Sequence, residues 1–249
     1  MDFHRLRHFL PSFPLIALPL SLSLLTGCSQ NFKDVNDTMG LAFFGEEDAS
    51  QSATDIHQLP YASLYARVED GPQAFMVLAL AEQDLRFGSS PSANNNPDEI
   101  KTNSPVKLKW LSSDKGMLVT QAGRLVKTLN LPQGNLTSVE SPFADPLALG
   151  LHHPETPTVW QFTLDWQPGY HYGYQALSQF APQGKQVILV NEQPVDVLYF
   201  VETVSVDKLN LSYKNEYWLS PSNGQVIKTR QKPAPSLPYI ELTILKPFA

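Results

Sequence analysis

One candidate metal site in this sequence consists of two adjacent histidines and a nearby acid. His152, His153 and Glu155 are residue types that bind zinc. Neighbouring side chains on a loop diverge, however, and this loop also contains Pro154 and Pro157. It offers neither a helical His-x-x-x-His pair nor a cysteine as a further ligand. We therefore predict a solvated loop here, with no metal site and no cofactor.

A nucleophile or a pair of carboxyls would be needed for hydrolysis. Ser112, Ser113 and Asp114 could be combined with one of six histidines into a triad, but the chain has no G-x-S-x-G elbow. Serine and aspartate are common in turns, which explains this group better. Asp145 and Glu155 could act as paired carboxyls only at a defined separation across a groove, which sequence spacing does not supply. The sequence therefore predicts no catalytic residues and no enzyme.

Aromatic side chains gather between residues 158 and 174. An aromatic face stacks well on the apolar C–H surface of a sugar ring, so this cluster is a candidate ligand surface. The candidates are Trp160, Trp166, Tyr170 and Tyr172, with His171 and Tyr174 beside them. Core packing and ordinary cross-strand pairing explain the same pattern, and we favour them over a ligand surface.

The only cysteine, Cys28, ends an apolar segment at the start of the chain. Arg5 and Arg7 give that segment a basic beginning, and residues 9–25 are too short and too interrupted by proline for a comfortable transmembrane helix. Residues 25–28 read Leu-Thr-Gly-Cys, so the segment resembles a bacterial lipoprotein signal with its lipobox. We expect residues 1–27 to be a removed signal peptide and Cys28 to carry acyl chains such as palmitate. A single thiol also excludes an internal disulfide.

The net charge of the mature chain limits the partners that it can bind. Removal of residues 1–27 takes away Arg5, Arg7 and Asp2 and leaves 16 basic against 23 acidic side chains. An acidic domain is a poor partner for nucleic acid or for anionic lipid headgroups. Membrane attachment must then come from the lipid on Cys28. Ser29, rather than aspartate, follows the cysteine, and by the lipoprotein sorting rule we expect an outer-membrane protein that faces the periplasm.

The rest of the chain predicts one all-β domain behind a tether. Residues 28–58 would hold the lipidated end, a short amphipathic helix marked by Phe32, Val35 and Met39, and a linker over 46–58. From residue 59 to 249 the apolar period changes to two. A polar tract at 88–103 predicts a mobile loop because it buries too little apolar surface.

About a dozen short strands are expected in this domain. The expected strands cover residues 59–69, 74–81, 106–110, 117–120, 124–129, 158–166, 187–190, 195–206, 211–219, 225–231 and 239–245, with a helical turn in 142–151. Turn signals such as Asn223-Gly224 separate them. The class is a single domain of many short antiparallel strands, either a twisted sandwich or a partly closed barrel. The 21 prolines argue against a regular barrel.

Several short motifs occur in an order that resembles one family. They are LPYASLYAR at 59–67, the apolar run 75–81 with Glu82-Gln83, KWLSSD at 109–114, residues 117–128, DPL at 145–147, YWL at 217–219, TRQ at 229–231 and LKP at 245–247. Together they are similar to the YjbF/GfcB type of lipoprotein, associated with group-four capsule and exopolysaccharide operons. The resemblance implies an accessory lipoprotein beside an outer-membrane β-barrel protein and a periplasmic partner, without established catalytic residues.

Two functions of different class follow from these observations. The first is a non-enzymatic lipoprotein that docks on a polysaccharide-exporting barrel. The second is a protein that binds or modifies polysaccharide through its aromatic surface. A carrier with a lipid-sized cavity is compatible with the all-β class, but no residue points to it.

Overall fold

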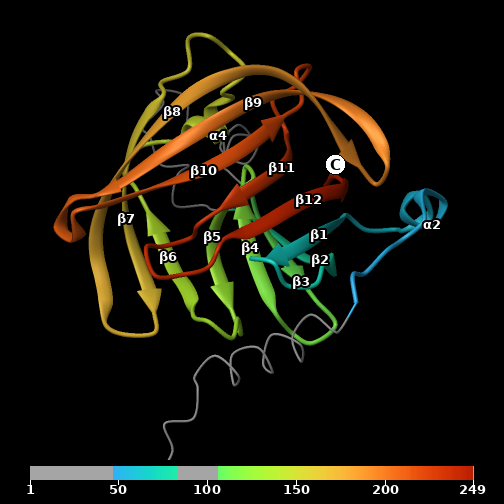
Figure 1. Ribbon diagram of the computed structural model, residues 1–249, viewed down its shortest axis with the longest axis horizontal. Coiled ribbons are helices and arrows are strands. Elements are labelled where there is room, and N and C mark those ends of the chain that lie inside the picture. The colour runs from blue at the N-terminus through green and yellow to red at the C-terminus, as the bar shows by residue number, and fades with distance from the viewer. Residues whose placement is uncertain (1–46, 84–105, 249) are drawn as a thin grey trace, which may run out of the picture.

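The structure is a computed structural model that describes residues 47–83 and 106–248. Within these residues, twelve antiparallel strands form one sheet that curls into a nearly closed barrel (Figure 1). The strand order is β5-β4-β3-β2-β1-β12-β11-β10-β9-β8-β7-β6. Consecutive strands are therefore neighbours, except β5 and β6, which are the two ends of the sheet. β1 pairs with β12, which joins the first strand of the chain to the last one described. The all-β, barrel-like class predicted from the sequence is confirmed.

The elements have the following bounds. The first strands are β1 (Ser63–Val68), β2 (Ala74–Gln83), β3 (Val106–Leu111), β4 (Met117–Gln121), β5 (Arg124–Leu129) and β6 (Asn135–Glu140). The others are β7 (Val159–Gln167), β8 (His171–Val190), β9 (Gln193–Val206), β10 (Leu211–Leu219), β11 (Val226–Gln231) and β12 (Ile240–Lys246). The helices are α2 (Ala53–Gln58), α4 (Pro146–Leu149) and the 3₁₀ helix η2 (Asp207–Leu209). None of the helices in the described ranges has the length and apolar composition to cross a membrane.

Two strands differ from the sequence prediction. β6 was missed because its sequence, NLTSVE, does not alternate, and its pairing with β7 shifts register between Leu136 and Ser138. β8 is one strand of 20 residues, although Pro182 and Gly184 interrupt its pattern. A register shift at these two residues lets the pairing with β9 continue past them.

The segment before β1 is packed on the barrel. Asp48 forms an ion pair with Arg67 at 2.6 Å, and the Ala49 amide donates to the Gln73 carbonyl at 2.8 Å. Ile56 of α2 is buried. The predicted linker over 46–58 is therefore wrong for residues 47–58, because contacts with strands far along the chain fix a stretch that has no strong pattern of its own. Cys28, the predicted helix at 32–39 and the tract at 88–103 lie outside the described residues.

Side chains connect the two ends of the sheet. The Leu136 amide of β6 donates to Thr128 Oγ1 of β5 at 2.9 Å, and the Leu131 amide donates to Asn135 Oδ1 at 3.1 Å. These bonds replace a backbone ladder between β5 and β6. They satisfy polar groups that an open sheet edge would leave unpaired.

The barrel interior is filled by apolar side chains from almost every strand. Its largest fully buried members are Trp110, Trp166, Leu64, Met76, Leu136, Leu164, Leu237 and Ile240. A second buried cluster joins Leu147 and Leu151, at α4, to Phe180, Phe200 and Tyr217. α4 therefore covers one end of the barrel, and the domain has a packed core rather than an open channel.

Candidate functional site

One cation lies inside the barrel, between two carboxylates. Arg124, the first residue of β5, donates through Nε and Nη2 to Asp145, the N-cap residue of α4. Its Nη1 and Nη2 atoms lie 3.1 and 2.9 Å from the two carboxylate oxygens of Glu202 on β9. We call Arg124, Asp145 and Glu202 the ion cluster. It joins three segments that are distant in the sequence.

Uncharged side chains donate further hydrogen bonds to the Glu202 carboxylate, which has no exposed surface. It accepts hydrogen bonds from Ser178 Oγ at 2.5 Å, Asn215 Nδ2 at 2.8 Å and the Tyr217 hydroxyl at 3.1 Å. A buried charge is tolerated only with this kind of complete partnership.

Aromatic rings enclose the guanidinium of Arg124. Its Cζ atom lies 4.6 Å from the Trp160 ring centroid and between 5.7 and 5.8 Å from those of Phe162, Phe180 and Tyr217. A cation at these distances is attracted by the ring faces. The rings also exclude water from the ion cluster.

The charged groups of the ion cluster shift each other's pKa values. Burial alone would lower the pKa of Arg124, but Asp145 and Glu202 raise it well above its ordinary value. Burial alone would raise the pKa of Glu202, but the Arg124 charge and the hydrogen bonds from Arg124, Ser178 and Asn215 bring it below its ordinary value. Arg124 and Glu202 therefore stay charged at neutral pH.

This pKa shift predicts a loss of stability in acid. A glutamate with a lowered folded-state pKa stabilises the fold above its unfolded pKa of 4.5, and this contribution disappears as the pH falls through the folded value. We expect the melting temperature to fall steeply below about pH 4.5 and the fall to be shallower in Glu202→Gln. Thermal melts of the unmodified chain and of Glu202→Gln, followed by circular dichroism between neutral pH and about pH 3, measure this dependence. Parallel profiles for the two proteins would contradict the prediction.

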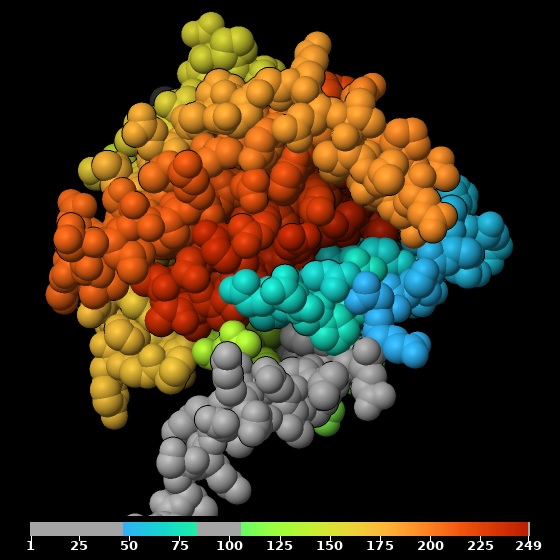
Figure 2. All heavy atoms as spheres, in the orientation of Figure 1, coloured from blue at the N-terminus to red at the C-terminus, as the bar shows by residue number. Residues whose placement is uncertain are grey.

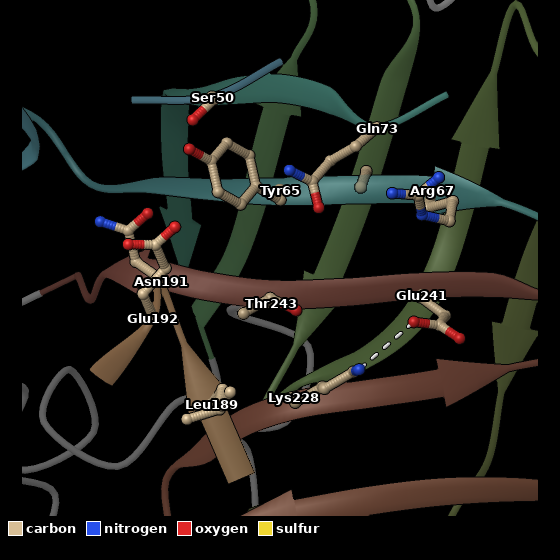
Figure 3. A pocket seen from close by; sticks show the side chains of 11 residues that line it. Ser50, Tyr65, Arg67, Gln73, Leu189, Asn191, Glu192, Lys228, Glu241 and Thr243 are labelled. Carbon is tan, nitrogen blue, oxygen red and sulfur yellow. Dashed lines mark ion pairs between the residues drawn. The ribbon is translucent and has the colours of Figure 1, made fainter. Parts of the chain in front are cut away.

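The second polar centre lies on the outer face of the barrel. A pocket of about 350 Å³ opens between β1, β11, β12, the segment before α2 and the β8–β9 turn (Figure 3). We call it the outer pocket. Its lining residues are Ser50, Tyr65, Ala66, Arg67, Gln73, Leu189, Asn191, Glu192, Lys228, Glu241 and Thr243.

Strand register brings the floor of the outer pocket together. Tyr65 and Arg67 lie two residues apart on β1 and share the outer face. They pair with Thr243 and Glu241 of β12, and Thr243 pairs in turn with Lys228 of β11 (Figure 3). Three neighbouring strands thus present a continuous polar row.

Existing contacts fix the charged groups of this floor. Arg67 binds Asp48 through Nη2 and the Gly71 carbonyl through Nη1, both at 2.6 Å. Lys228 Nζ lies 3.4 Å from Glu241 Oε2. The side chains of Arg67, Lys228 and Glu241 remain about one-third exposed, so they are positioned yet reachable by a ligand.

The β8–β9 turn overhangs this floor. Figure 2 shows the hairpin, in orange, reaching over the red C-terminal strands toward the blue segment at 47–58. Asn191 and Glu192 form the turn with φ angles of 47° and 66°. Both angles are positive, as in the two-residue hairpin turns that normally carry Asn-Gly. Both residues line the pocket.

The four aromatic candidates separate into two pairs. Trp160 and Trp166 are only 6% and 1% exposed, and their Nε1 atoms donate to the Phe143 carbonyl and to Ser236 Oγ inside the protein. These two rings therefore belong to the core and present no surface for a sugar. Tyr170 and Tyr172 are 94% and 50% exposed at the start of β8, away from the outer pocket.

The other sequence candidates do not assemble into a reactive group. The rings of His152 and His153 pack on each other with centroids 3.8 Å apart, and Glu155 is exposed. Across residues 47–83 and 106–248, no three His, Cys, Asp or Glu side chains gather where a metal could bind. Ser112 Oγ donates to Asp114 Oδ1 at 2.5 Å within the β3–β4 turn.

Sequence reasoning missed Arg124, Glu202 and the outer pocket. One signal was present for Glu202, because it occupies an inward position of β9 between the apolar Phe200 and Val204. An acid on a buried face implies a buried partner. The pocket had no such signal, since its residues come from separate segments between Ser50 and Thr243.

The fold is that of an all-β lipoprotein domain. The solved structure titled as the hypothetical lipoprotein YmcC from Escherichia coli (K12) is similar, with a TM-score of 0.65 and 26% sequence identity, over 89% of this chain and 99% of that one. Residues 36–245 match the family described as "Group 4 capsule polysaccharide lipoprotein gfcB, YjbF". The chain belongs to this family.

Two curated relatives from Escherichia coli (strain K12) support the assignment. "Uncharacterized lipoprotein YjbF" is 31% identical over 92% of this chain and 96% of its own length. "Uncharacterized lipoprotein GfcB" is 29% identical over 92% of this chain and 98% of its own length. The similarity therefore covers nearly the whole of each protein.

Proposed function

We propose that this chain is an accessory lipoprotein of capsule or exopolysaccharide production that is anchored in the outer membrane, faces the periplasm, and acts by docking to an export-barrel partner rather than by catalysis. Membership of a capsule polysaccharide lipoprotein family supports the process. The Leu-Thr-Gly-Cys sequence at 25–28, followed by Ser29, supports the anchor and its membrane.

The observation that carries the docking role is the long β8–β9 hairpin. β7 pairs with β8 only as far as Gln179, and β10 pairs with β9 only from Leu198 onward. Beyond these points, within the described chain, the two strands pair only with each other up to Val190 and Gln193. We call the paired strands of this stretch, residues 181–190 and 193–197, the ribbon, and the turn residues Asn191 and Glu192 lie outside it. Its backbone has two edges that can accept a further strand.

The side chains of the ribbon also suit a partner strand. Val187 and Leu189 are 64% and 69% exposed, which is unusual for adjacent positions of one strand face. An extended segment of the partner that pairs with the edge of β8 would satisfy the open backbone groups and cover Val187. Lys185 and Pro182 lie in the same stretch and limit nonspecific edge pairing.

The surroundings of the catalytic candidates support a role without catalysis. Asp145 is bound to Arg124 and caps α4, so it has a structural function. Ser112 and Asp114 bond to each other in a turn. Glu155 lies on an exposed loop. A hydrolase would need two such groups to share one site.

The docking proposal predicts that a charge introduced on the ribbon weakens partner binding. Val187→Asp places a carboxylate in the proposed contact, and we expect at least about tenfold less recovery of the outer-membrane export protein of the same operon, a cost of ~1.4 kcal/mol. The measurement is affinity purification of the full chain from outer membranes, with that export protein detected by antibody.

The matched control is Val159→Asp. Val159 on β7 is also an exposed valine on a strand, but it lies outside the ribbon. We expect this variant to recover the export protein as the unmodified chain does. Equal recovery with Val187→Asp and the unmodified chain, at equal abundance, would exclude the ribbon as the docking surface.

A further inference from the structure

The outer pocket is a built site whose polar lining lies outside the ribbon, and only Leu189 belongs to both. We propose that it binds a short segment of an uncharged saccharide. This binding role goes beyond docking, because the pocket lies under the β8–β9 turn whereas the proposed partner strand adds to the edge of β8.

The charges of the outer pocket are balanced. Arg67 and Lys228 contribute two cations, and Glu192 and Glu241 contribute two carboxylates. Such a lining offers no net attraction to a strongly charged ligand. Both cations are already paired, Arg67 with Asp48 and Lys228 with Glu241. An anionic ligand would have to compete with these partners, whereas an uncharged ligand can bond to the free sites of the same groups.

Neutral groups in the pocket present both donors and acceptors. The Tyr65 oxygen accepts a hydrogen bond from the Gln51 amide at 2.6 Å, which leaves the hydroxyl hydrogen to donate. Gln73 Nε2 donates to the Ala49 carbonyl at 2.8 Å, which leaves Oε1 to accept. The hydroxyl of Thr243 can do either. Sugar hydroxyls also donate and accept, so a saccharide matches this mixture.

Size and polarity exclude other common ligands. A volume of about 350 Å³ lies at the small end of ligand pockets, which span roughly 300–1,000 Å³. Pockets for lipids and for apolar cofactors are lined mainly by apolar side chains. Here only Leu189 and Ala66 are apolar, and Leu189 can cover the C–H face of a sugar ring.

The turn above the pocket adds a charged group to the lining. Glu192 adopts a φ of 66°, a left-handed conformation that is unfavourable for a side chain of this kind. At the β10–β11 turn the chain has Asn223-Gly224, with glycine at a φ of 70°. Glycine would relieve the strain at 192 in the same way. The strained residue instead places a carboxylate at the pocket, as is common at binding sites.

The test separates binding from stability. The full-length chain, purified from membranes in detergent, is titrated calorimetrically with three probes. These are the uncharged oligosaccharides from partial hydrolysis of the source bacterium's surface polysaccharide, the acidic fragments of the same preparation, and inorganic phosphate. We expect saturable binding of the uncharged fraction alone.

Glu192→Gly should then weaken that binding by at least about tenfold, while its melting temperature is unchanged or higher. Glu155→Gln, an exposed acid outside the pocket, should bind as the unmodified chain does. Recovery of the export protein should be unchanged in both variants, because Glu192 lies in the turn, outside the paired strands of the ribbon, and Glu155 lies outside the hairpin. A failure of docking therefore leaves this result interpretable. No binding of the uncharged fraction, binding of the acidic fragments or phosphate alone, or unchanged affinity in Glu192→Gly would overturn the proposal.

Discussion

Glu202→Ala is expected to lower the free energy of unfolding by about 3–5 kcal/mol, because it leaves Arg124 buried with half of its countercharge removed. The substitution also removes the acceptor for the buried side chains of Ser178 and Asn215. The Tyr217 hydroxyl loses one of its two acceptors. Urea unfolding followed by tryptophan fluorescence measures the change. The loss is comparable to the total stability of many domains, so we also expect little protein to accumulate in cells.

The matched control for Glu202→Ala is Glu241→Ala. Glu241 also faces two cations, with Lys228 at 3.4 Å and Arg230 at 3.8 Å, but its side chain is 35% exposed on the outer face. Pairs of this kind contribute about 0–1 kcal/mol. Similar costs for the two substitutions would mean that the ion cluster adds nothing beyond an ordinary surface pair.

Gly134→Ala is expected to cost about 3 kcal/mol, through backbone strain and steric overlap together. Gly134 lies between β5 and β6, where the barrel closes, and has a φ of 120°. A methyl group there would overlap the backbone carbonyl oxygen of Gln167 and would meet Leu237 in the core. The Gln167 oxygen is a backbone atom and cannot rotate away as a side chain could, so the segment between β5 and β6 would have to move. Thermal melts of the purified variant measure the effect.

Gly184→Ala separates strain from overlap. Gly184 has a similar φ of 100°, but a methyl group there would meet no atom within 4 Å. Its cost should be about 1 kcal/mol, from the backbone conformation alone. Equal costs for Gly134→Ala and Gly184→Ala would show that the closure between β5 and β6 can adjust freely.

The fold class and most of the strands follow from local patterns in the sequence. In β1 the alternation of Leu64, Ala66 and Val68 with polar neighbours is a local property, because successive side chains of a strand point to opposite faces. The turn at Asn223-Gly224 is local as well, since Gly224 readily adopts the positive φ of 70° found there. Family motifs along the chain then indicated a capsule-associated lipoprotein, and residues 36–245 match that family.

Contacts between distant residues depend instead on how the whole sheet is assembled. Arg124 and Glu202 are 78 residues apart, and no local pattern specifies their contact. Alternation shows that Trp160 and Trp166 share a face of β7, but closure of the sheet decides that this face is the inside. The outer pocket likewise exists because the register of β1, β12 and β11 aligns Tyr65, Thr243 and Lys228. Faces are set by local spacing, whereas inside, outside and cross-strand neighbours are set by how the whole sheet pairs and closes.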